Sequence, residues 1–552
     1  MMADPDQLAP ARGAARRAKA LLLAANEPTL DPRIDWFAEG LSADYDVCEL
    51  GVDAAAKAPS VERVSPRRTR VRVDGRHVSW DALAPHAKLN ADTLGVRTIK
   101  NLLVAGQLPA RALAESVGAT GAVEAGLVSL RWSCLYFVRT NSALIEAGRR
   151  IGGFDVVVAA DLDTLPAALT LAEQYGVPLV YDAHEYWPYA FSHFQNWESE
   201  FWREVEKSII GRVTLPLTVS PQLAAIMSDA YGVTFDCVPN CAPLGCEAAI
   251  DLEAALAARA SSEDVVFLYQ GVIAPQRGIE KLVGAWGKVD KRAKLWLRGP
   301  DGPDKSALME QARNTGLIDR GVFFPGAVSE AELIAAARQA DIGLIPYEPI
   351  SVNNRYCCPN KLSQYMAAGL PVICNRLDYV RSVVVDNEIG TSVDFSDEGA
   401  LIRTIDEYVM KRDAIPAMSR KSQEVFKSAF NWQSASRTVY ARIGELVDKT
   451  GTKGAEFDFA WIDGPEPWRS EVSGQEEQIN ALNQEIARLH TVYTEHQVMM
   501  QSEIDSLRKR CAEETEKLAN APLTLIAYFG LRRVALLLKG LGGAFTASRK
   551  RL

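Results

Sequence analysis

Lys361 stands in the run of residues 359–373, whose residue types and spacing suit the binding of an anion. A proline at the start of this run and Gly369 near its end are typical of helix boundaries, and the run then enters a short apolar strand. The free amides of a helix's first turn attract negative charge, and Lys361 adds a full positive charge there. The sequence therefore predicts an anion site at the start of this helix.

Two consecutive α/β units are expected to position this helix. Apolar runs alternate with helical patterns from about Ala20 to Cys241, and the alternation restarts at Val265 after a polar connector. Continuous apolar runs separated by helices are typical of a parallel sheet covered on both faces. Ligands of such doubly wound sheets bind at the carboxyl ends of strands, so functional residues are sought in the loops there.

Length and composition fit two domains with appendages, because 552 residues with 48% apolar content exceed a single core. The formal charge of −9 gives no general attraction to nucleic acid. No run reaches the roughly 20 uninterrupted apolar residues of a membrane-spanning helix. Nine scattered cysteines fit free thiols, and the group Cys237, Cys241 and Cys246 lacks the paired spacing of a zinc site. We therefore expect a cytoplasmic protein.

The domain boundaries follow from shifts in pattern. They are a basic tail (1–19), a first domain (20–241), a connector (242–262), a second domain (263–431), a crossover helix (432–450), a linker (451–474), a coiled coil (475–519) and an amphipathic basic tail (520–552). Apolar residues at 3-4 spacing favour a dimeric coiled coil over a solvated single helix. The basic and apolar tail suits either an interfacial helix on anionic lipid, at the inner face of the membrane, or a helix docked on the protein itself.

The run from Pro359 to Val372 resembles the donor helix of retaining GT-B glycosyltransferases of glycosyltransferase family 4, which looks like Pro-Asn-Lys-Leu-Phe-Glu-Tyr-Met-Ala-Ala-Gly-x-Pro-Val. A second run, Tyr269 to Ile279, resembles the family's glycine turn followed by Arg/Lys-Gly. The resemblance implies two Rossmann-like doubly wound domains facing a cleft. It covers about residues 20–447 and does not reach the coiled coil or the tail.

The resemblance also implies which residues bind the nucleotide-sugar donor. They are Gly271, Arg277, Asn360, Lys361, Leu362 and Gln364. Arg277 would meet the donor diphosphate, with Gly271 letting the backbone approach. The family's ribose-binding Glu is replaced here by Gln364, and the Glu that the family often has eight residues earlier is replaced by Tyr356.

The first domain carries two runs that resemble family motifs bordering the acceptor. In the run 155–166, Ala160 stands where many members have His, and Asp161 is the next polar residue. Asp161 either orients the acceptor or is a carboxylate at a helix N-terminus, and its Asp-x-Asp spacing with Asp163 leaves a metal site as a minor alternative. His184, in an Asp-x-His-Glu element, either positions an acceptor or is structural. The loop with Asn26 and 31–33 looks like the family's opening loop.

The resemblance to this family predicts a hexosyltransferase-like enzyme that transfers a sugar from a nucleotide-sugar donor with retention of configuration. Asp161, His184, Arg277 and Lys361 are the expected catalytic residues, and fixed cations would stabilise the departing diphosphate without a metal ion or a further cofactor. The acceptor is a glycan, a lipid-linked saccharide or a small molecule. A non-catalytic nucleotide-sugar-binding scaffold and a nucleotide-sugar epimerase of the same fold are the alternatives.

Overall fold

The computed structural model describes residues 17–53, 58–74, 136–137, 139–190, 196–247, 251–275, 277–451 and 455–462. Apart from Tyr136, they belong to one compact unit formed by Met1–Asn90 and Phe137–Gly464. The expected coiled coil (475–519) and amphipathic tail (520–552), and most of the basic tail (1–19), lie outside the described residues.

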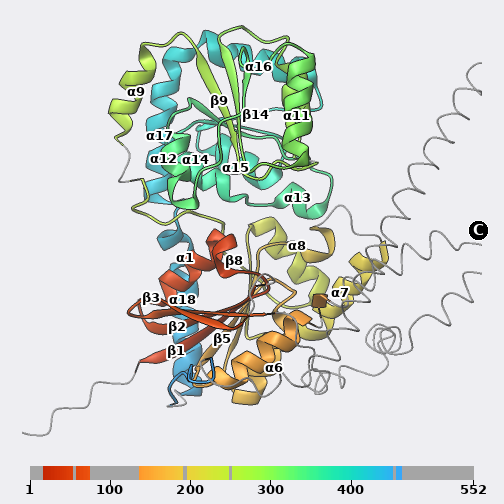
Figure 1. Cartoon of the computed structure of the whole chain (residues 1–552), viewed down its shortest axis with the longest axis vertical. Coiled ribbons are helices and arrows are strands. Elements are labelled where there is room, and N and C mark those ends of the chain that lie inside the picture. The colour runs from red at the N-terminus through yellow and green to blue at the C-terminus, as the bar shows by residue number, and fades with distance from the viewer. Residues whose placement is uncertain are drawn as a thin grey trace, which may run out of the picture. The chain divides into compact units, whose positions relative to one another are not determined.

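The N-terminal half is built on an eight-stranded sheet with the strand order β3-β4-β2-β1-β5-β6-β7-β8 (Figure 1). Its strands are β1 (Ala18–Ala24), β2 (Tyr45–Val52), β3 (Ser60–Ser65), β4 (Arg68–Val73), β5 (Val156–Ala160), β6 (Leu179–Ala183), β7 (Leu215–Thr218) and β8 (Asp236–Cys237). Its helices are α1 (Pro32–Leu41), α6 (Leu165–Tyr175), α7 (Asn196–Ile210) and α8 (Pro221–Tyr231), and residues 139–151 are also helical. The order reverses between β1 and β5, which makes the loops that follow these two strands neighbours.

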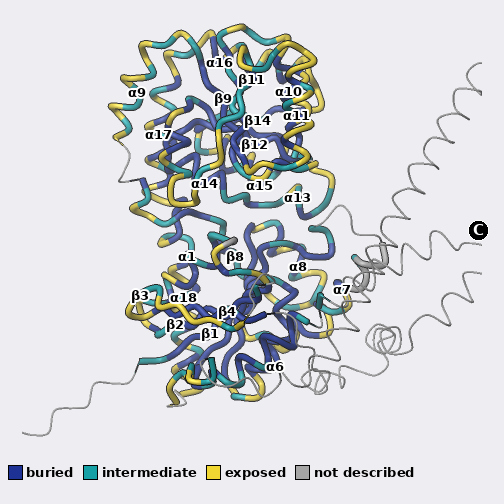
Figure 2. The backbone as a smooth tube through the Cα atoms, in the orientation of Figure 1, coloured by how far each residue is buried: buried dark blue, intermediate teal, exposed yellow. Residues whose placement is uncertain are grey.

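One edge of this sheet departs from the all-parallel pattern, because β3 pairs antiparallel with β4. β4 is buried although it alternates with arginines, and its Arg68 and Arg70 form ion pairs with the fully buried Glu49 of β2. β3 is largely exposed, as its yellow trace indicates (Figure 2). A search of the sequence for apolar runs misses such a hairpin, because its buried face is filled by paired charges and not by apolar side chains.

The C-terminal half has a six-stranded parallel sheet with the order β11-β10-β9-β12-β13-β14. Its strands are β9 (Val265–Gln270), β10 (Ala293–Arg298), β11 (Val322–Phe323), β12 (Ile342–Ile345), β13 (Val372–Cys374) and β14 (Gly390–Ser392). Its helices are α9 (Leu252–Ala260), α10 (Ile279–Ala285), α11 (Pro303–Asn314), α12 (Leu333–Ala337), α13 (Val352–Tyr356), α14 (Asn360–Ala367), α15 (Asp378–Asp386), α16 (Glu398–Met410) and α17 (Ile415–Ser428). The central strands β9, β12 and β13 are wholly buried, which places the core of this half around the reversal between β9 and β12.

Helix α18 (Trp432–Thr450) connects the C-terminal half back to the N-terminal half. Trp432 packs its ring 6.0 Å from the rings of Trp36 and Phe37 on α1, measured between centroids, and the Tyr440 hydroxyl donates to the carbonyl of Phe37. Aromatic burial of this kind is a large contribution to an interface. The two halves are therefore joined by a packed helix.

Residues 455–462, within the stretch expected to be a linker, are docked on the N-terminal half. The Asp458 amide donates to the carbonyl of Ile151 at 2.8 Å, and the guanidinium of Arg150 lies 5.3 Å from the ring centroid of Trp461. The aromatic content of this stretch explains the difference, because the rings gain burial by docking.

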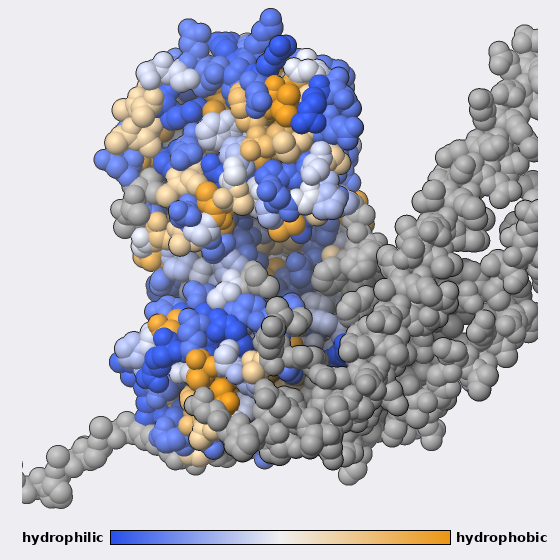
Figure 3. Space-filling view, viewed as in Figure 1, coloured by the Kyte–Doolittle hydropathy of each residue, from blue (hydrophilic) through white to orange (hydrophobic). Residues whose placement is uncertain are grey.

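The visible surface of the C-terminal half is mainly hydrophilic with scattered apolar patches (Figure 3). Among the described residues no helix has the length and apolar character needed to traverse a bilayer.

Candidate active site

A cavity of about 1030 Å³ opens where the carboxyl ends of strands from both sheets meet. His184 follows β6, Gly271 follows β9 and Tyr347 follows β12, and all three line the cavity. The wall also includes residues from the loop after β1, from the segment after β8, from α13 and from the first turns of α14. Of the predicted site residues, those that line the cavity are His184, Gly271, Arg277, Asn360, Lys361 and Gln364.

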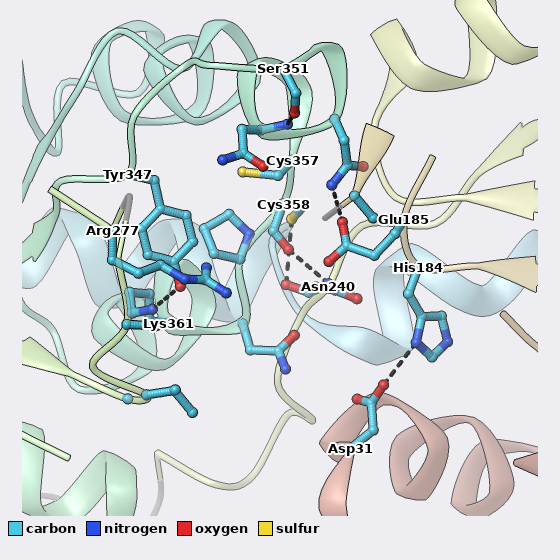
Figure 4. A pocket seen from close by; sticks show the side chains of 18 of the residues that line it. Asp31, His184, Glu185, Asn240, Arg277, Tyr347, Ser351, Cys357, Cys358 and Lys361 are labelled. Carbon is cyan, nitrogen blue, oxygen red and sulfur yellow. Dashed lines mark hydrogen bonds and ion pairs between the residues drawn. The ribbon is translucent and has the colours of Figure 1, made fainter. Parts of the chain in front are cut away.

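Arg277 and Lys361 are brought together by Tyr347, a residue that the sequence reasoning did not single out. The Arg277 guanidinium lies 4.1 Å from the centroid of the Tyr347 ring, and the Lys361 Nζ lies 4.3 Å from it and donates to the Tyr347 hydroxyl. Figure 4 shows both cations beside Tyr347. Within the described ranges neither cation has a carboxylate at ion-pair distance, so positive charge is available to a ligand. Because Tyr347 stands two residues after the apolar run 342–345, the strand-end rule could have found it.

Burial and mutual repulsion shape the electrostatics of this pair. Burial lowers the pKa of Lys361, and the charge of Arg277 lowers it further, against the attraction of Tyr347. Burial alone would raise the pKa of Tyr347, but the attraction of Lys361 and Arg277 outweighs it, so the pKa of this phenol is lowered. A buried cation without a counter-charge is costly, and a bound polyphosphate would neutralise it.

Two glycines allow the chain to pass close to these cations. Gly278 has φ of +71°, and a Cβ there would lie 2.2 Å from the carbonyl oxygen of Pro346. Gly271 has φ of +126° and lies against the Lys361 side chain. Both backbone conformations favour glycine. The loop after β9 can therefore fold onto the loop after β12.

Helix α14 begins at the cavity, with Pro359 at its N-cap. Asn360 lines the cavity, and its Oδ1 is buried without a hydrogen-bond partner in the described part of the chain. Leu362 differs from the expectation: its side chain is fully buried in the core, and its amide donates to the carbonyl of Pro359 at 2.9 Å. The first turn of α14 thus offers the amides of Asn360 and Lys361 to an anion, but not that of Leu362.

Gln364 lies one helical turn beyond Lys361 and faces a carboxylate. Its Nε2 donates to Glu330 Oε1 at 3.0 Å, and Glu330 also lines the cavity. Glu330 belongs to the short 3-10 helix η4 (Glu330–Glu332) before α12. Nothing in the spacing of the sequence connects residues 330 and 364, so sequence reasoning missed this pair.

On the N-terminal side, His184 is held between three carboxylates. Figure 4 shows its contact with one of them, Asp31. The His184 Nδ1 lies 2.8 Å from Asp31 Oδ2, and its Nε2 lies 3.1 Å from Asp182 Oδ2. Burial alone would lower the pKa of His184, but Asp161, Asp31 and Asp182 outweigh it and hold the pKa well above its usual value. Both ring nitrogens therefore donate, and His184 is an imidazolium.

Arg33 holds this cluster of carboxylates and His184 in place. Its side chain is fully buried and donates two hydrogen bonds to the Asp182 carboxylate, at 2.9 and 2.6 Å. It also donates to Asn240 Oδ1 at 2.8 Å. Such a bidentate pair is rigid. Burial would raise the pKa of Asp182, but Arg33 and His184 lower it strongly, so this carboxylate stays ionised.

Asp161 supports His184 and is not part of the cavity wall. Its Oδ1 accepts from the His184 amide at 2.9 Å, and its backbone has the left-handed φ of 61°. Burial raises the pKa of Asp161 well above its usual value, opposed by the charge of His184. Asp163 is buried beside it, and across the described ranges no three His, Cys, Asp or Glu side chains are arranged to hold a metal ion.

Two amide side chains connect the halves at the cavity. Asn353 on α13 donates to Glu185 Oε2 and accepts from the Tyr186 amide at 2.8 Å. Asn240, after β8, donates to the carbonyl of Cys358 at 2.7 Å. Tyr356 does not line the cavity, whereas Glu185 does, so a carboxylate from the N-terminal half lies beside α13.

Solved structures with the same architecture identify the fold. A sucrose-phosphate synthase from Thermosynechococcus elongatus aligns with a TM-score of 0.55 at 17% identity, over 79% of this chain and 99% of that one. The Anabaena protein HepE with UDP and glucose aligns with a TM-score of 0.53 at 13% identity, over 78% of this chain and 100% of that one. The two facing Rossmann-like sheets therefore define the GT-B fold of glycosyltransferases.

Family models match both halves of the chain. One described as Glycosyltransferase Family 4 matches residues 103–244, and one described as Glycosyl transferases group 1 matches residues 264–410. The two matches together span slightly more than half of the 552 residues. Both halves of the chain thus resemble family 4 glycosyltransferases, and together with the fold they support a glycosyltransferase like those of that family.

Curated relatives are more distant. A phosphatidyl-myo-inositol mannosyltransferase of Mycolicibacterium smegmatis is 26% identical over 46% of this chain and 61% of its own length. One of Mycobacterium leprae is 28% identical over 27% of this chain and 37% of its own length. The matched region thus spans about a third to three fifths of these relatives.

Proposed function

We propose that the chain transfers a sugar from a nucleotide-sugar donor to an acceptor hydroxyl, with the donor on the C-terminal half and the acceptor on the N-terminal half. The observation that carries the proposal is the pair Arg277, in the loop after β9, and Lys361, in the first turn of α14. Both cations lie beside Tyr347 and have no carboxylate partner in the described ranges. Such a pair suits the diphosphate that departs when the sugar–phosphate bond breaks.

The transfer proceeds with retention of configuration and without a protein base. His184 is an imidazolium whose two N–H groups are taken by Asp31 and Asp182, so it cannot accept a proton from the acceptor. A departing phosphate oxygen takes that proton instead, while the sugar bond to the acceptor forms on the same face. His184 then acts as a positioning residue, with Arg277 and Lys361 supplying the charge that a metal ion would otherwise provide.

The acceptor is a hydroxyl group borne by a lipid or a glycan. The curated relatives are named for phosphatidyl-myo-inositol, which supports a lipid-borne polyol as one member of this class. The location in this proposal is the cytoplasm, with residues 520–552 touching the inner face of the membrane and residues 475–519 forming a homodimer.

The test is the release of nucleoside diphosphate from a panel of nucleotide-sugars, with cell extract as the source of acceptor. Lys361→Met is expected to lower the rate by about 10² to 10³-fold, the cost of removing one preorganised charge from such a site. The same variant should unfold at a higher temperature, because an unpaired buried cation is replaced by an apolar chain of similar length. Lys288→Met, at an exposed pair with Glu398, is the control that should change neither quantity.

Two results would count against the proposal. Turnover that Lys361→Met leaves unchanged would remove the diphosphate site, and a loss of turnover together with a lower melting temperature would reduce Lys361 to a structural residue. Tight binding of nucleotide-sugar without turnover on any acceptor would favour the scaffold alternative. The replacements at Ala160, Tyr356 and Gln364 are the features that favour that alternative.

A further inference from the structure

Glu330 is a carboxylate in the cavity wall without a cation to balance it. In the described part of the chain, the hydrogen bond to its side chain comes from the Gln364 amide at 3.0 Å, and no Lys, Arg or His lies at ion-pair distance. Burial raises the pKa of Glu330, the Gln364 hydrogen bond opposes this, and the charge of Asp31 adds to it. The Glu330 side chain is nevertheless exposed to solvent, so beyond the Gln364 amide its donors are water molecules, which the hydroxyl groups of a ligand in the cavity can replace.

The position of Glu330 is fixed on both sides. Its 3-10 helix starts with a capping box, in which Ser329 and Glu332 bond reciprocally, and the exposed Glu332 points its carboxylate at that cap. Gln364 is 95% buried on α14, so the amide that holds Glu330 is itself held by packing. The carboxylate is therefore preorganised before a ligand arrives.

Two acceptor atoms result from this arrangement. Gln364 uses its Nε2 on Glu330, which leaves its Oε1 as an acceptor, and Glu330 keeps its second oxygen. Two neighbouring acceptors match two neighbouring hydroxyl groups. The pair lies about one helical turn, roughly 5 Å, from Lys361 along α14. That separation suits the pentose next to a diphosphate bound at Lys361.

We propose that Glu330, held by Gln364, binds the vicinal hydroxyls of the ribose in the nucleoside diphosphate. The inference rests on the proposed function, since it needs a nucleotide at the cavity. In this proposal Glu330, on the short 3-10 helix before α12, supplies the carboxylate that α14 lacks at Gln364. It also predicts a preference for ribonucleotides over deoxyribonucleotides.

The experiment compares Glu330→Gln with the matched control Glu332→Gln. Both residues are exposed and stand on the same 3-10 helix, but Glu332 does not line the cavity and its carboxylate is bonded to Ser329. Isothermal titration calorimetry on the full chain would measure Kd for UDP, GDP and ADP, and for the 2′-deoxy form of whichever binds best. The wild type and Glu332→Gln should prefer the ribonucleotide by about 10-fold. Glu330→Gln should weaken ribonucleotide binding by about 10 to 100-fold, the range for a hydrogen bond to a charged group, and abolish the preference.

Each outcome decides between the proposals. If Glu330→Gln weakens both nucleotides equally, or changes neither, the ribose assignment is overturned while the diphosphate site stands. If the preference survives in Glu330→Gln, another residue reads the hydroxyls and the assignment fails. If the wild type binds none of the three nucleoside diphosphates, the proposed function itself fails, and the ribose assignment fails with it.

Discussion

His184 shows how a single residue can be fixed by its charge state. Asp31 and Asp182 occupy both ring nitrogens, and Asp161 accepts from the His184 backbone amide. The imidazolium is thereby the cation of an acidic cluster, and Arg33 supplies the second positive charge from beneath. The cluster can orient an acceptor through its carboxylates but has no free base at His184.

The charge of His184 leads to a prediction about stability and pH. Because the folded-state pKa is raised above its ordinary value of 6.5, the stability that the proton brings is fully present below 6.5 and is lost as pH rises through the folded-state pKa. The free energy of unfolding of wild type minus that of His184→Gln should therefore be largest in mildly acidic solution and shrink toward alkaline pH. Urea unfolding at a series of pH values measures it.

The lower limit of this pH window is set by the partners of His184. The pKa of Asp31 and that of Asp182 are lowered from 3.8, because His184 and Arg33 outweigh burial, so their contribution is present above 3.8 and lost as pH falls further. A difference between the two proteins that stays constant from acidic to alkaline pH would show that His184 is neutral in the folded protein.

At the scale of elements, the loop between β9 and α10 depends on Gly278. A side chain there would meet the Pro346 carbonyl at 2.2 Å, in a backbone conformation with φ of +71°. Gly278→Ala should therefore destabilise the protein by about 1 to 3 kcal/mol and weaken nucleotide binding, because the loop carries Arg277. Chemical denaturation and nucleotide titration measure the two effects.

The same helix supplies the control for this prediction. Gly284 lies inside α10, and a Cβ there would meet nothing within 4 Å. Gly284→Ala should stabilise the protein by about 0.5 to 1 kcal/mol, because alanine loses less backbone entropy in a helix. If both substitutions destabilise equally, crowding of the loop is not the cause.

Local patterns in the sequence predicted the elements better than they predicted the neighbours across the cavity. The two doubly wound α/β units, which apolar runs and helix boundaries predicted as local signals, are confirmed, and so is the GT-B fold that the family resemblance implied. Leu362 was expected to bind the donor but is core, because membership of a motif does not say which face of a helix a residue occupies. Glu330 was missed because its relation to Gln364 exists only after the strands are ordered. Tyr347 was missed although its place just after the apolar run 342–345 was a usable signal.

At the scale of the whole molecule, the cavity depends on contacts between the two halves. Asn353 connects the start of α13 to Glu185 and Tyr186, and Asn240 connects the end of the first sheet to Cys358 just before α14. Each connection reaches a segment next to the anion site. These contacts therefore tie the placement of the two halves to the positions of the residues that would hold the donor.

A swap of amide and carboxylate tests this coupling. Asn353→Asp places a carboxylate against Glu185, where burial already raises the pKa of Glu185, so the variant should lose a few degrees of melting temperature and bind nucleotide more weakly. Glu185→Gln should be milder, because an amide can still accept from Asn353. The double variant Asn353→Asp with Glu185→Gln again pairs one amide with one carboxylate. The side-chain oxygen at position 353 can still accept from the Tyr186 amide. The double variant should recover most of the stability that Asn353→Asp loses. Differential scanning calorimetry measures the melting temperature, and small-angle scattering measures the spacing of the two halves. Strictly additive effects of the two substitutions would mean that the two side chains do not couple.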